Sequence, residues 1–406
     1  MSVGVERVPG GVIRFFDARS IAIGGIGLSL LGFWLVLPPL TLRTWVWPVA
    51  LGFLGVAAGI WAVTRGVRRL GWGAVAIGIL SMTLGLLALE SSVGKLDVVV
   101  VWSALLASML RYATPLTFAA IGGIFCERSG VVNIALEGMM LAGAFFGILA
   151  SQKTGSWELG LLAAMGAGAA LALIHAVFSI HLRADQIVSG TAINFLALGV
   201  TGYFFVDVYG QEGTPEGIPR VPDIDLPLEK IPTGIGDFLD DVLGHLNLMI
   251  WLSFLLLVVA YVVLFKTPIG LRIRAVGEHP RAADTVGISV YGIRYAAVIV
   301  SGILAALGGA YLSIGFLGSF NENMTAGRGF IALAAVIFGA WRPFGAFAAA
   351  LLFGFSSALA QRLPEYSGSA ATLFQALPYV LTLIAVAGVI GRSIPPAASG
   401  RPYIKQ

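Results

Sequence analysis

Residues 127–147 read ERSGVVNIALEGMMLAGAFFG, and they interrupt an apolar chain with polar and helix-breaking residues. Inside a bilayer every backbone N–H and C=O group needs a hydrogen-bond partner. Irregular polar backbone is therefore tolerated there only where it is buried in protein or lines a water-filled cavity. Interrupted helices of this kind are the best sequence indication of a solute site in a transporter. The stretch predicts a channel or a transporter subunit.

The composition places this stretch in a membrane protein. The chain has 406 residues, of which 58% are hydrophobic and only 11% are charged, whereas soluble domains carry about 25% charged residues. The 53 glycines suit close helix packing in lipid. We attribute the net charge of +4 to cytoplasmic loops and expect no nucleic acid partner. Cys126 is the single cysteine, so we expect no intrachain disulfide and no metal site. We also expect no cofactor.

Apolar runs predict an all-α polytopic membrane protein with about ten to twelve spans, some of them discontinuous, because a span needs about 20 apolar residues. Two runs leave alternatives open. Residues 98–125 contain Arg111 and Pro115 and form either two pieces or one tilted helix, and residues 329–340 form either half of a broken helix or part of the next one. The candidate spans are residues 21–40, 46–64, 70–89, 98–125, 134–151, 159–180, 187–206, 246–265, 290–314, 329–340, 344–360 and 371–390.

Charge predicts the orientation in the cell membrane. The loop of residues 266–290 is basic and should be cytoplasmic, whereas residues 207–245 carry nine of the 21 acidic residues and should be external. Both termini then lie in the cytoplasm. We divide the chain into an N-terminal extension of about three spans (residues 1–95), a transport core (96–395) and a cytoplasmic tail (396–406).

The first interruption holds the strongest candidates for a solute pathway. Asn133 and Glu137 are four residues apart and share one face of a helix, and an ionisable residue inside a membrane segment favours a functional role. Glu127 and Arg128 have an alternative interpretation as a pair at a cytoplasmic helix end. Phe146 is placed to stack on a planar solute, although packing is the commoner use of such a ring.

Two further segments supply pathway candidates. Residues 318–329, GSFNENMTAGRG, contain Glu322 and Asn323, and an apolar helix resumes directly afterwards. Two glycine-broken segments in corresponding halves suggest an internal repeat with the pathway at its centre, and an ordinary external loop is the alternative. Asn194 lies within an apolar run, where it serves either the pathway or a hydrogen bond between helices.

Residues 274–287, RAVGEHPRAADTVG, predict a short amphipathic helix on the cytoplasmic side. Pro280 suits the first turn of a helix, and Ala282, Ala283 and Val286 give it a small apolar face. Such a helix could dock in a groove of another protein, and a solvated loop is the alternative. The chain has no GxxxxGK[ST] phosphate-binding loop and no catalytic motif, so we expect a transport subunit driven by a partner ATPase, not an enzyme.

These stretches together resemble a known family. Residues 127–147, then AVGEHPRAADTVGISV (275–290), SGILAALGGAYLSIG (301–315) and GRGFIALAAVIFGAWRPFGA (327–346), are similar to permease subunits of ATP-binding-cassette (ABC) importers of the simple-sugar and branched-chain amino-acid superfamily. The similarity is closest to nucleoside importers that work with a basic-membrane-protein type lipoprotein. It covers about residues 105–390 and leaves out the first three spans and part of the acidic external loop.

The resemblance implies inward transport by alternating access, for nucleosides, with purine nucleosides favoured. It implies a second related permease, two cytoplasmic ABC ATPases and an extracytoplasmic substrate-binding lipoprotein as partners. A sugar or another small polar solute is the alternative cargo. An ion-coupled secondary transporter, with Glu137 as its coupling carboxylate, is the rival from another class, and a membrane enzyme or a structural scaffold is less favoured. The resemblance places Asn133, Glu137, Glu322 and Asn323 in the central polar region of the family, and Gly277, Ala282, Ala283 and Gly287 in its ATPase-coupling element. To these we add Asn194 and Phe146 as pathway candidates and Glu278 as a coupling candidate.

Overall fold

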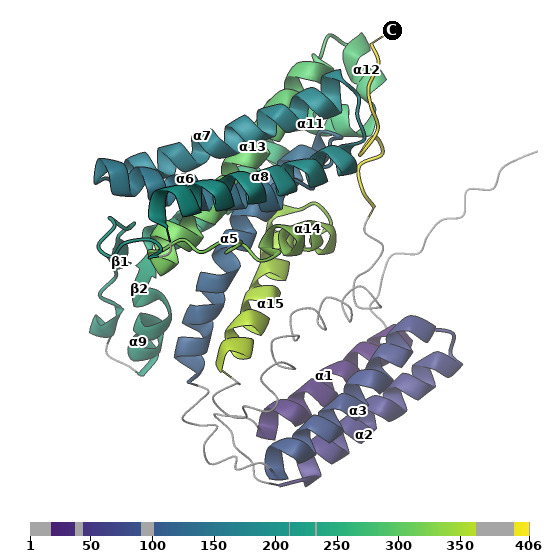
Figure 1. The fold of residues 1–406 in the computed structure, drawn as a ribbon. Helices are drawn as coiled ribbons and strands as arrows, with labels where there is room; N and C mark the ends of the chain where they lie inside the picture. Colours follow the sequence, from purple (N-terminus) through teal and green to yellow (C-terminus); the bar gives the residue numbers. More distant parts are fainter. Residues whose placement is uncertain are drawn as a thin grey trace, which may run out of the picture. The chain divides into compact units, whose positions relative to one another are not determined.

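The computed structural model describes residues 18–36, 44–90, 101–210, 212–231, 234–362 and 394–405. Most of the described residues, 78%, are helical, which confirms the all-α polytopic class (Figure 1). They fall into two compact units, divided between Trp102 and Ser103.

The first unit is a bundle of three apolar helices, α1 (Ala18–Val36), α2 (Val46–Thr64) and α3 (Arg68–Glu90). Small residues lie where the helices cross: a Cβ added at Gly25 would lie 2.8 Å from the Cβ of Ala58. Large apolar side chains such as Phe53 and Trp72 point outward. This pattern is expected of helices that pack through glycine and face lipid.

The second unit contains both interruptions. Its long helices are built from apolar runs, and shorter elements connect them. Its elements are α5 (Trp102–Arg128), α6 (Leu136–Thr154), α7 (Trp157–Ala176), η2 (Val177–His181), α8 (Gln186–Tyr209), β1 (Asp223–Asp225), η3 (Leu228–Lys230), α9 (Gly234–Leu239), η4 (Asp240–Gly244), β2 (His245–Asn247), α10 (Leu248–Lys266), α11 (Pro268–Glu278), α12 (Pro280–Thr285), α13 (Val290–Ala310), η5 (Tyr311–Leu317), α14 (Arg328–Phe338) and α15 (Pro343–Arg362).

Helices α6, α7 and α13 pack against one another and form the centre of this unit, and α8 packs on α6 (Figure 1). Glycines allow the backbones to touch. A Cβ at Gly168 of α7 would lie 2.3 Å from the carbonyl oxygen of Gly302 of α13, and one at Gly309 of α13 would lie 1.8 Å from that of Met140 of α6. No side chain fits at such crossings, so the glycines fix the spacing of the three helices.

Eight helices in the described part of the chain are long and apolar enough to cross a membrane. Of the run of residues 98–125, for which the sequence allowed two interpretations, residues 102–125 form most of one continuous helix, α5, with Pro115 inside it. Residues 329–340 form α14, a short separate helix followed by a turn into α15. The candidate span of residues 371–390 lies outside the described residues.

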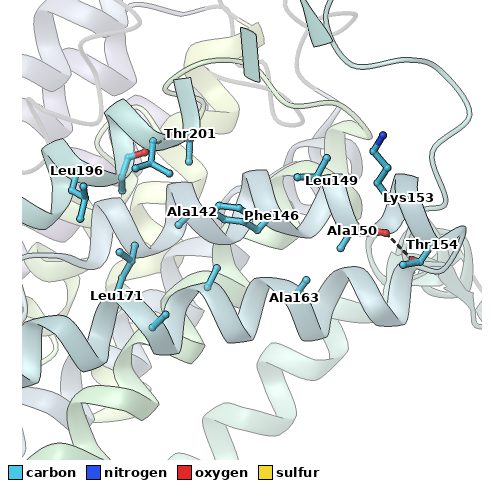
Figure 2. A pocket seen from close by; sticks show the side chains of 14 residues that line it. Ala142, Phe146, Leu149, Ala150, Lys153, Thr154, Ala163, Leu171, Leu196 and Thr201 are labelled. Atoms are coloured by element: carbon cyan, nitrogen blue, oxygen red, sulfur yellow. Dashed lines mark hydrogen bonds between the residues drawn. The ribbon is translucent and has the colours of Figure 1, made fainter. Parts of the chain in front are cut away.

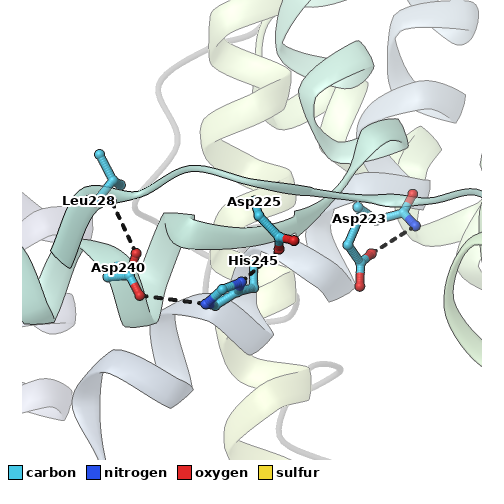
Figure 3. Close-up of polar contacts among 6 residues, drawn as sticks. Asp223, Asp225, Leu228, Asp240 and His245 are labelled. Carbon is cyan, nitrogen blue, oxygen red and sulfur yellow. Dashed lines mark hydrogen bonds and ion pairs between the residues drawn. The ribbon is translucent and has the colours of Figure 1, made fainter. Parts of the chain in front are cut away.

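The acidic segment between α8 and α10 contains a small antiparallel hairpin in which Asp225 of β1 pairs with His245 of β2. The imidazole of His245 lies between two carboxylates (Figure 3): its Nδ1 is 2.8 Å from Asp225 and its Nε2 is 3.5 Å from Asp240. The hydrogen bond with Asp225 and the negative charge of Asp240 raise the pKa of His245 above its ordinary value.

We expect His245 to titrate above the ordinary histidine value of about 6.5. Because the folded pKa is raised, this cluster stabilises the hairpin below the unfolded pKa, and the contribution is lost as the pH rises through the folded pKa. An NMR titration of histidine-labelled protein in nanodiscs measures the pKa. Asp225→Asn should lower it, whereas Asp223→Asn is the matched control, because Asp223 bonds to Asn247 instead. An Asp225→Asn protein with an unchanged His245 pKa would contradict the assignment.

Candidate functional site

The first interruption is irregular backbone between α5 and α6, and most of it is buried. Side chains from other helices satisfy its polar groups. The N–H of Val132 donates to Oε1 of Gln186 (2.7 Å), the carbonyl of Val132 lies 3.0 Å from Nε2 of His175, and Nδ2 of Asn194 donates to the carbonyl of Ile134 (3.0 Å). These bonds supply the partners that non-helical backbone needs away from water.

Asn133 and Asn194 are part of this framework. Asn133 is fully buried; its Nδ2 donates to the hydroxyl of Ser301 (2.9 Å), and its Oδ1 accepts from the N–H of Ala135 (3.0 Å). Asn194 Oδ1 accepts from the N–H of Gly138 (2.8 Å). Both amides therefore hold the first interruption in its shape.

Glu137 joins the first interruption to the second. Its buried carboxylate accepts three hydrogen bonds: Oε1 from the hydroxyl of Thr325 (2.6 Å) and the N–H of Gly327 (2.8 Å), and Oε2 from the N–H of Gly329 (2.6 Å). Gly327 and Gly329 lie at the N-terminus of α14, where unpaired N–H groups and the helix dipole favour an anion. Glu137 thus caps a helix that begins 191 residues later in the chain.

The other end of α14 is held by the same interruption. Trp341, in the turn after α14, has a φ of 55°, which is uncommon for a residue other than glycine. Its indole Nε1 donates to Glu127, and its carbonyl accepts from Nε and Nη2 of Arg128 (3.2 and 3.1 Å). Glu127 and Arg128 therefore bind Trp341, whereas the sequence left open that they pair with each other. Residues of the first interruption, Glu137 at one end and Glu127 and Arg128 at the other, therefore hydrogen-bond to both ends of the short helix α14.

Glu322 and Asn323 are not part of this buried cluster. Both are exposed in the turns before α14, and Asn323 has a φ of 55°. The structure brings Asn133, Glu137 and Asn194 together at the first interruption and leaves Glu322 and Asn323 at the surface of the chain. Thr325, which completes the contact with Glu137, was not singled out from the sequence, because a lone threonine in a polar loop gives no signal.

Phe146 lines a separate cavity between α6, α7 and α8 (Figure 2). The cavity holds about 630 Å³, and alanine and leucine side chains form most of its wall. Lys153 is the one charged residue of its lining, and the hydroxyls of Thr154 and Thr201, which also line it, donate to carbonyls of their own helices. None of the five polar pathway candidates contributes to the lining. Binding sites for polar solutes need a few well-placed polar groups, so this cavity alone does not orient such a solute.

The predicted coupling segment forms α11 and α12. Ala282, Glu278 and Gly287 are exposed, as is Val286 at 74%. Gly277 is buried, and a Cβ there would lie 2.1 Å from the carbonyl oxygen of Arg128.

The sequence predicted that Ala282, Ala283 and Val286 share one apolar face of α12, but in the structure they do not all point the same way. Ala283 turns inward and packs with Val276, Val290 and Tyr403, whereas Ala282 and Val286 remain outside. The tail residue Tyr403 is what covers Ala283, and the sequence pattern of α12 does not reveal it.

A buried, hydrogen-bonded interruption within a bundle of long apolar helices defines a membrane transport subunit. Residues 105–386 match the family described as the permease component of the branched-chain amino acid transport system, and the chain belongs to this family. It is therefore a multi-pass membrane permease and not an enzyme.

Curated relatives narrow the class to ABC transporter permeases. The chain is 45% identical to the guanosine ABC transporter permease protein NupQ of Bacillus subtilis, over 76% of this chain and 99% of NupQ. It is 41% identical to the nucleoside ABC transporter permease protein NupC of Lactococcus lactis, over 76% of this chain and 99% of NupC. A second Bacillus subtilis guanosine permease, NupP, is 24% identical over 64% of this chain and 74% of NupP. No solved structure matches the chain.

Proposed function

We propose that this chain is the transmembrane permease subunit of an ATP-driven importer of nucleosides. The observation that carries the proposal is its identity of more than 40% to two nucleoside permeases over almost their whole length. Purine nucleosides are the favoured cargo, because the first of these relatives is named for guanosine. The chain moves its solute inward by alternating access.

We further propose that the residues at the two interruptions shape the pathway. Glu137 fixes the start of α14, and Asn133 and Asn194 fix the backbone before α6. Both carboxylate oxygens of Glu137 already accept hydrogen bonds, which favours a positioning role over the cation binding that an ion-coupled transporter requires. In this proposal the partner permease completes the pathway beside three further residues, which then contact the solute: Phe146, Glu322 and Asn323.

Three kinds of partner complete the proposed importer. Bacillus subtilis has two different guanosine permeases, NupQ and NupP, which supports a second, related permease beside this chain. Cytoplasmic ABC ATPases supply the energy and dock on the exposed side of α12. An extracytoplasmic substrate-binding lipoprotein delivers the solute.

The orientation and domain division also belong to this proposal. The basic loop of residues 266–290 faces the cytoplasm, and the acidic residues 207–245 face outward. The backbone N–H of Ala398 donates to the carbonyl of Gly277 (2.9 Å), which supports a cytoplasmic C-terminus beside that loop. We also propose that residues 1–95 form an extension to the permease core (96–395); the separation of α1, α2 and α3 into a compact unit of their own among the described helices supports this division.

Uptake of labelled guanosine into cells that produce this chain together with its partner subunits tests the cargo. The proposal requires that unlabelled nucleosides compete and that glucose and leucine do not. It also requires that uptake survives collapse of the proton and sodium gradients while ATP is maintained. Competition by glucose alone would support the sugar alternative, and loss of uptake with the gradients would support the secondary transporter.

We expect Ala282→Asp to weaken ATPase docking about tenfold, since a like charge or an unpaired charge at a protein interface costs affinity. Ala282 is exposed, so the fold should not change. Retention of the ATPase on the tagged permease during purification measures the effect. Ala282→Ser, which adds a polar group without charge, is the matched control. Full ATPase retention by Ala282→Asp would remove this face of α12 from the interface.

A further inference from the structure

The C-terminal tail is packed along the coupling segment. We call residues 394–405 the strap. Two backbone hydrogen bonds attach it to the rest of the unit: the N–H of Ala398 donates to the carbonyl of Gly277 (2.9 Å), and the N–H of Gly400 donates to the carbonyl of Gly130 (3.2 Å). The strap therefore contacts both α11 and the first interruption. In Figure 1 it is the yellow segment beside α11 and α12.

Tyr403 anchors the strap to α12 and α13. Its ring is buried with Ala283 and Val290, its hydroxyl donates to Oδ2 of Asp284 (2.8 Å), and its carbonyl accepts from the hydroxyl of Tyr291 (3.3 Å). The buried guanidinium of Arg294 donates to the carbonyl of Arg401 (3.1 Å). This many specific contacts fix the position of a segment that has no helix or strand of its own.

The strap and α12 enclose a cleft of about 360 Å³. Arg281 lies on the α12 side, and Arg401 and Ile404 lie on the strap side. All three side chains are exposed, Ile404 at 53%. In the described part of the chain neither arginine forms an ion pair, while the two carboxylates nearby, Glu278 and Asp284, already accept hydrogen bonds from the strap.

We propose that the strap completes the ATPase-docking surface and that this cleft receives a carboxylate-bearing segment of the cytoplasmic ATPase. The proposal rests on the proposed function, since it requires an ATPase partner. Two arguments select this occupant. The lining carries two arginines, Arg281 and Arg401, against one carboxylate, Glu278, whose Oε2 accepts a hydrogen bond from the N–H of Ala397, so the excess charge of the cleft is positive and complements an acidic partner. The cleft is also continuous with the exposed face of α12, because Arg281 precedes Ala282 in the same helix.

Charge reversal tests the surface in the full complex. Arg401→Glu should lower the affinity of the permease pair for the ATPase about tenfold or more, as opposed charges become like charges, and Arg401→Lys should keep most of it. Lys266→Glu, an exposed cation at the end of α10 that does not line the cleft, is the remote control. Co-purification with the second permease reports on the fold of each variant. Equal ATPase affinity of Arg401→Glu and the unchanged chain would overturn the proposal.

Chemical protection gives a second test that does not depend on a weakened variant. Cys126, the single native cysteine, is buried, so Ile404→Cys offers one reactive thiol. Bound ATPase should slow maleimide labelling of Ile404→Cys about tenfold or more while leaving Lys266→Cys unchanged, because a buried interface excludes the reagent. Equal labelling of Ile404→Cys with and without bound ATPase would refute the proposal that the strap is part of the ATPase-docking surface. It would leave the proposed importer function unaffected. If the unchanged chain binds no ATPase at all, both proposals fail.

Discussion

Replacing Glu137 with alanine is expected to abolish uptake. The change leaves the hydroxyl of Thr325 and the N–H groups of Gly327 and Gly329 without their acceptor in a buried site. Each buried donor left unpaired costs about 1–3 kcal/mol. The cost of three unpaired donors is a large fraction of the free energy of unfolding of a typical protein, which is only about 5–15 kcal/mol. Since about 1.4 kcal/mol is a tenfold change in population, the correct position of α14 should become rare.

Uptake per assembled complex and the thermal midpoint of the purified complex measure this effect. Glu137→Gln is the matched control, because its carbonyl oxygen keeps one acceptor while its amide group cannot accept from the remaining donors. We expect Glu137→Gln to fall between the unchanged chain and Glu137→Ala in both measurements. Normal uptake by Glu137→Ala would remove Glu137 and the start of α14 from the working parts of the permease.

Gly309→Ala should also destabilise the fold. Its Cβ would lie 1.8 Å from the carbonyl oxygen of Met140 and 2.6 Å from the Met140 carbonyl carbon, so α6 and α13 must move apart. Overpacking of this kind costs about 1–3 kcal/mol or more, and the first interruption is attached to both helices through Asn133 and Ser301. We expect a lower thermal midpoint and a smaller yield of monodisperse protein.

Gly166→Ala is the control for this prediction. Gly166 also lies inside a helix, but an added Cβ meets nothing within 4 Å. Alanine is favoured over glycine in a helix by about 0.5–1 kcal/mol, so this variant should be as stable as the unchanged chain or slightly more so. Equal behaviour of Gly309→Ala and Gly166→Ala would show that α6 and α13 do not pack through Gly309.

The helices and the two interruptions could be predicted from the sequence because their signals are local. Apolar runs of span length require helices in lipid, and the polar residues of 127–147 and 318–329 have no place in such a run. The sequence allowed two interpretations of residues 98–125, because the run is too long for one upright helix and contains Arg111 and Pro115. The helix is continuous in the structure, where the carbonyl oxygen of Pro115 is in close contact with Gly308 of α13.

The hydrogen bonds and packing contacts between segments could not be predicted, because they join residues far apart in the chain. Glu137 bonds to residues that follow it by 188 to 192 positions, and no periodicity relates them. Ala283 faces inward because Tyr403 of the strap covers it. A helix of six residues has too few turns to indicate its buried face, and a short polar tail does not indicate where it packs. The internal repeat remains a prediction.

The ATPase activity of the purified complex in lipid tests the central claim most directly. The tagged chain would be purified with the products of its neighbouring genes, reconstituted with the binding lipoprotein, and assayed with guanosine, glucose or leucine. A nucleoside importer predicts a complex of two permeases and an ATPase whose hydrolysis guanosine stimulates severalfold while glucose and leucine do not. A chain that purifies without an ATPase, or a complete complex whose hydrolysis ignores nucleosides, would contradict it.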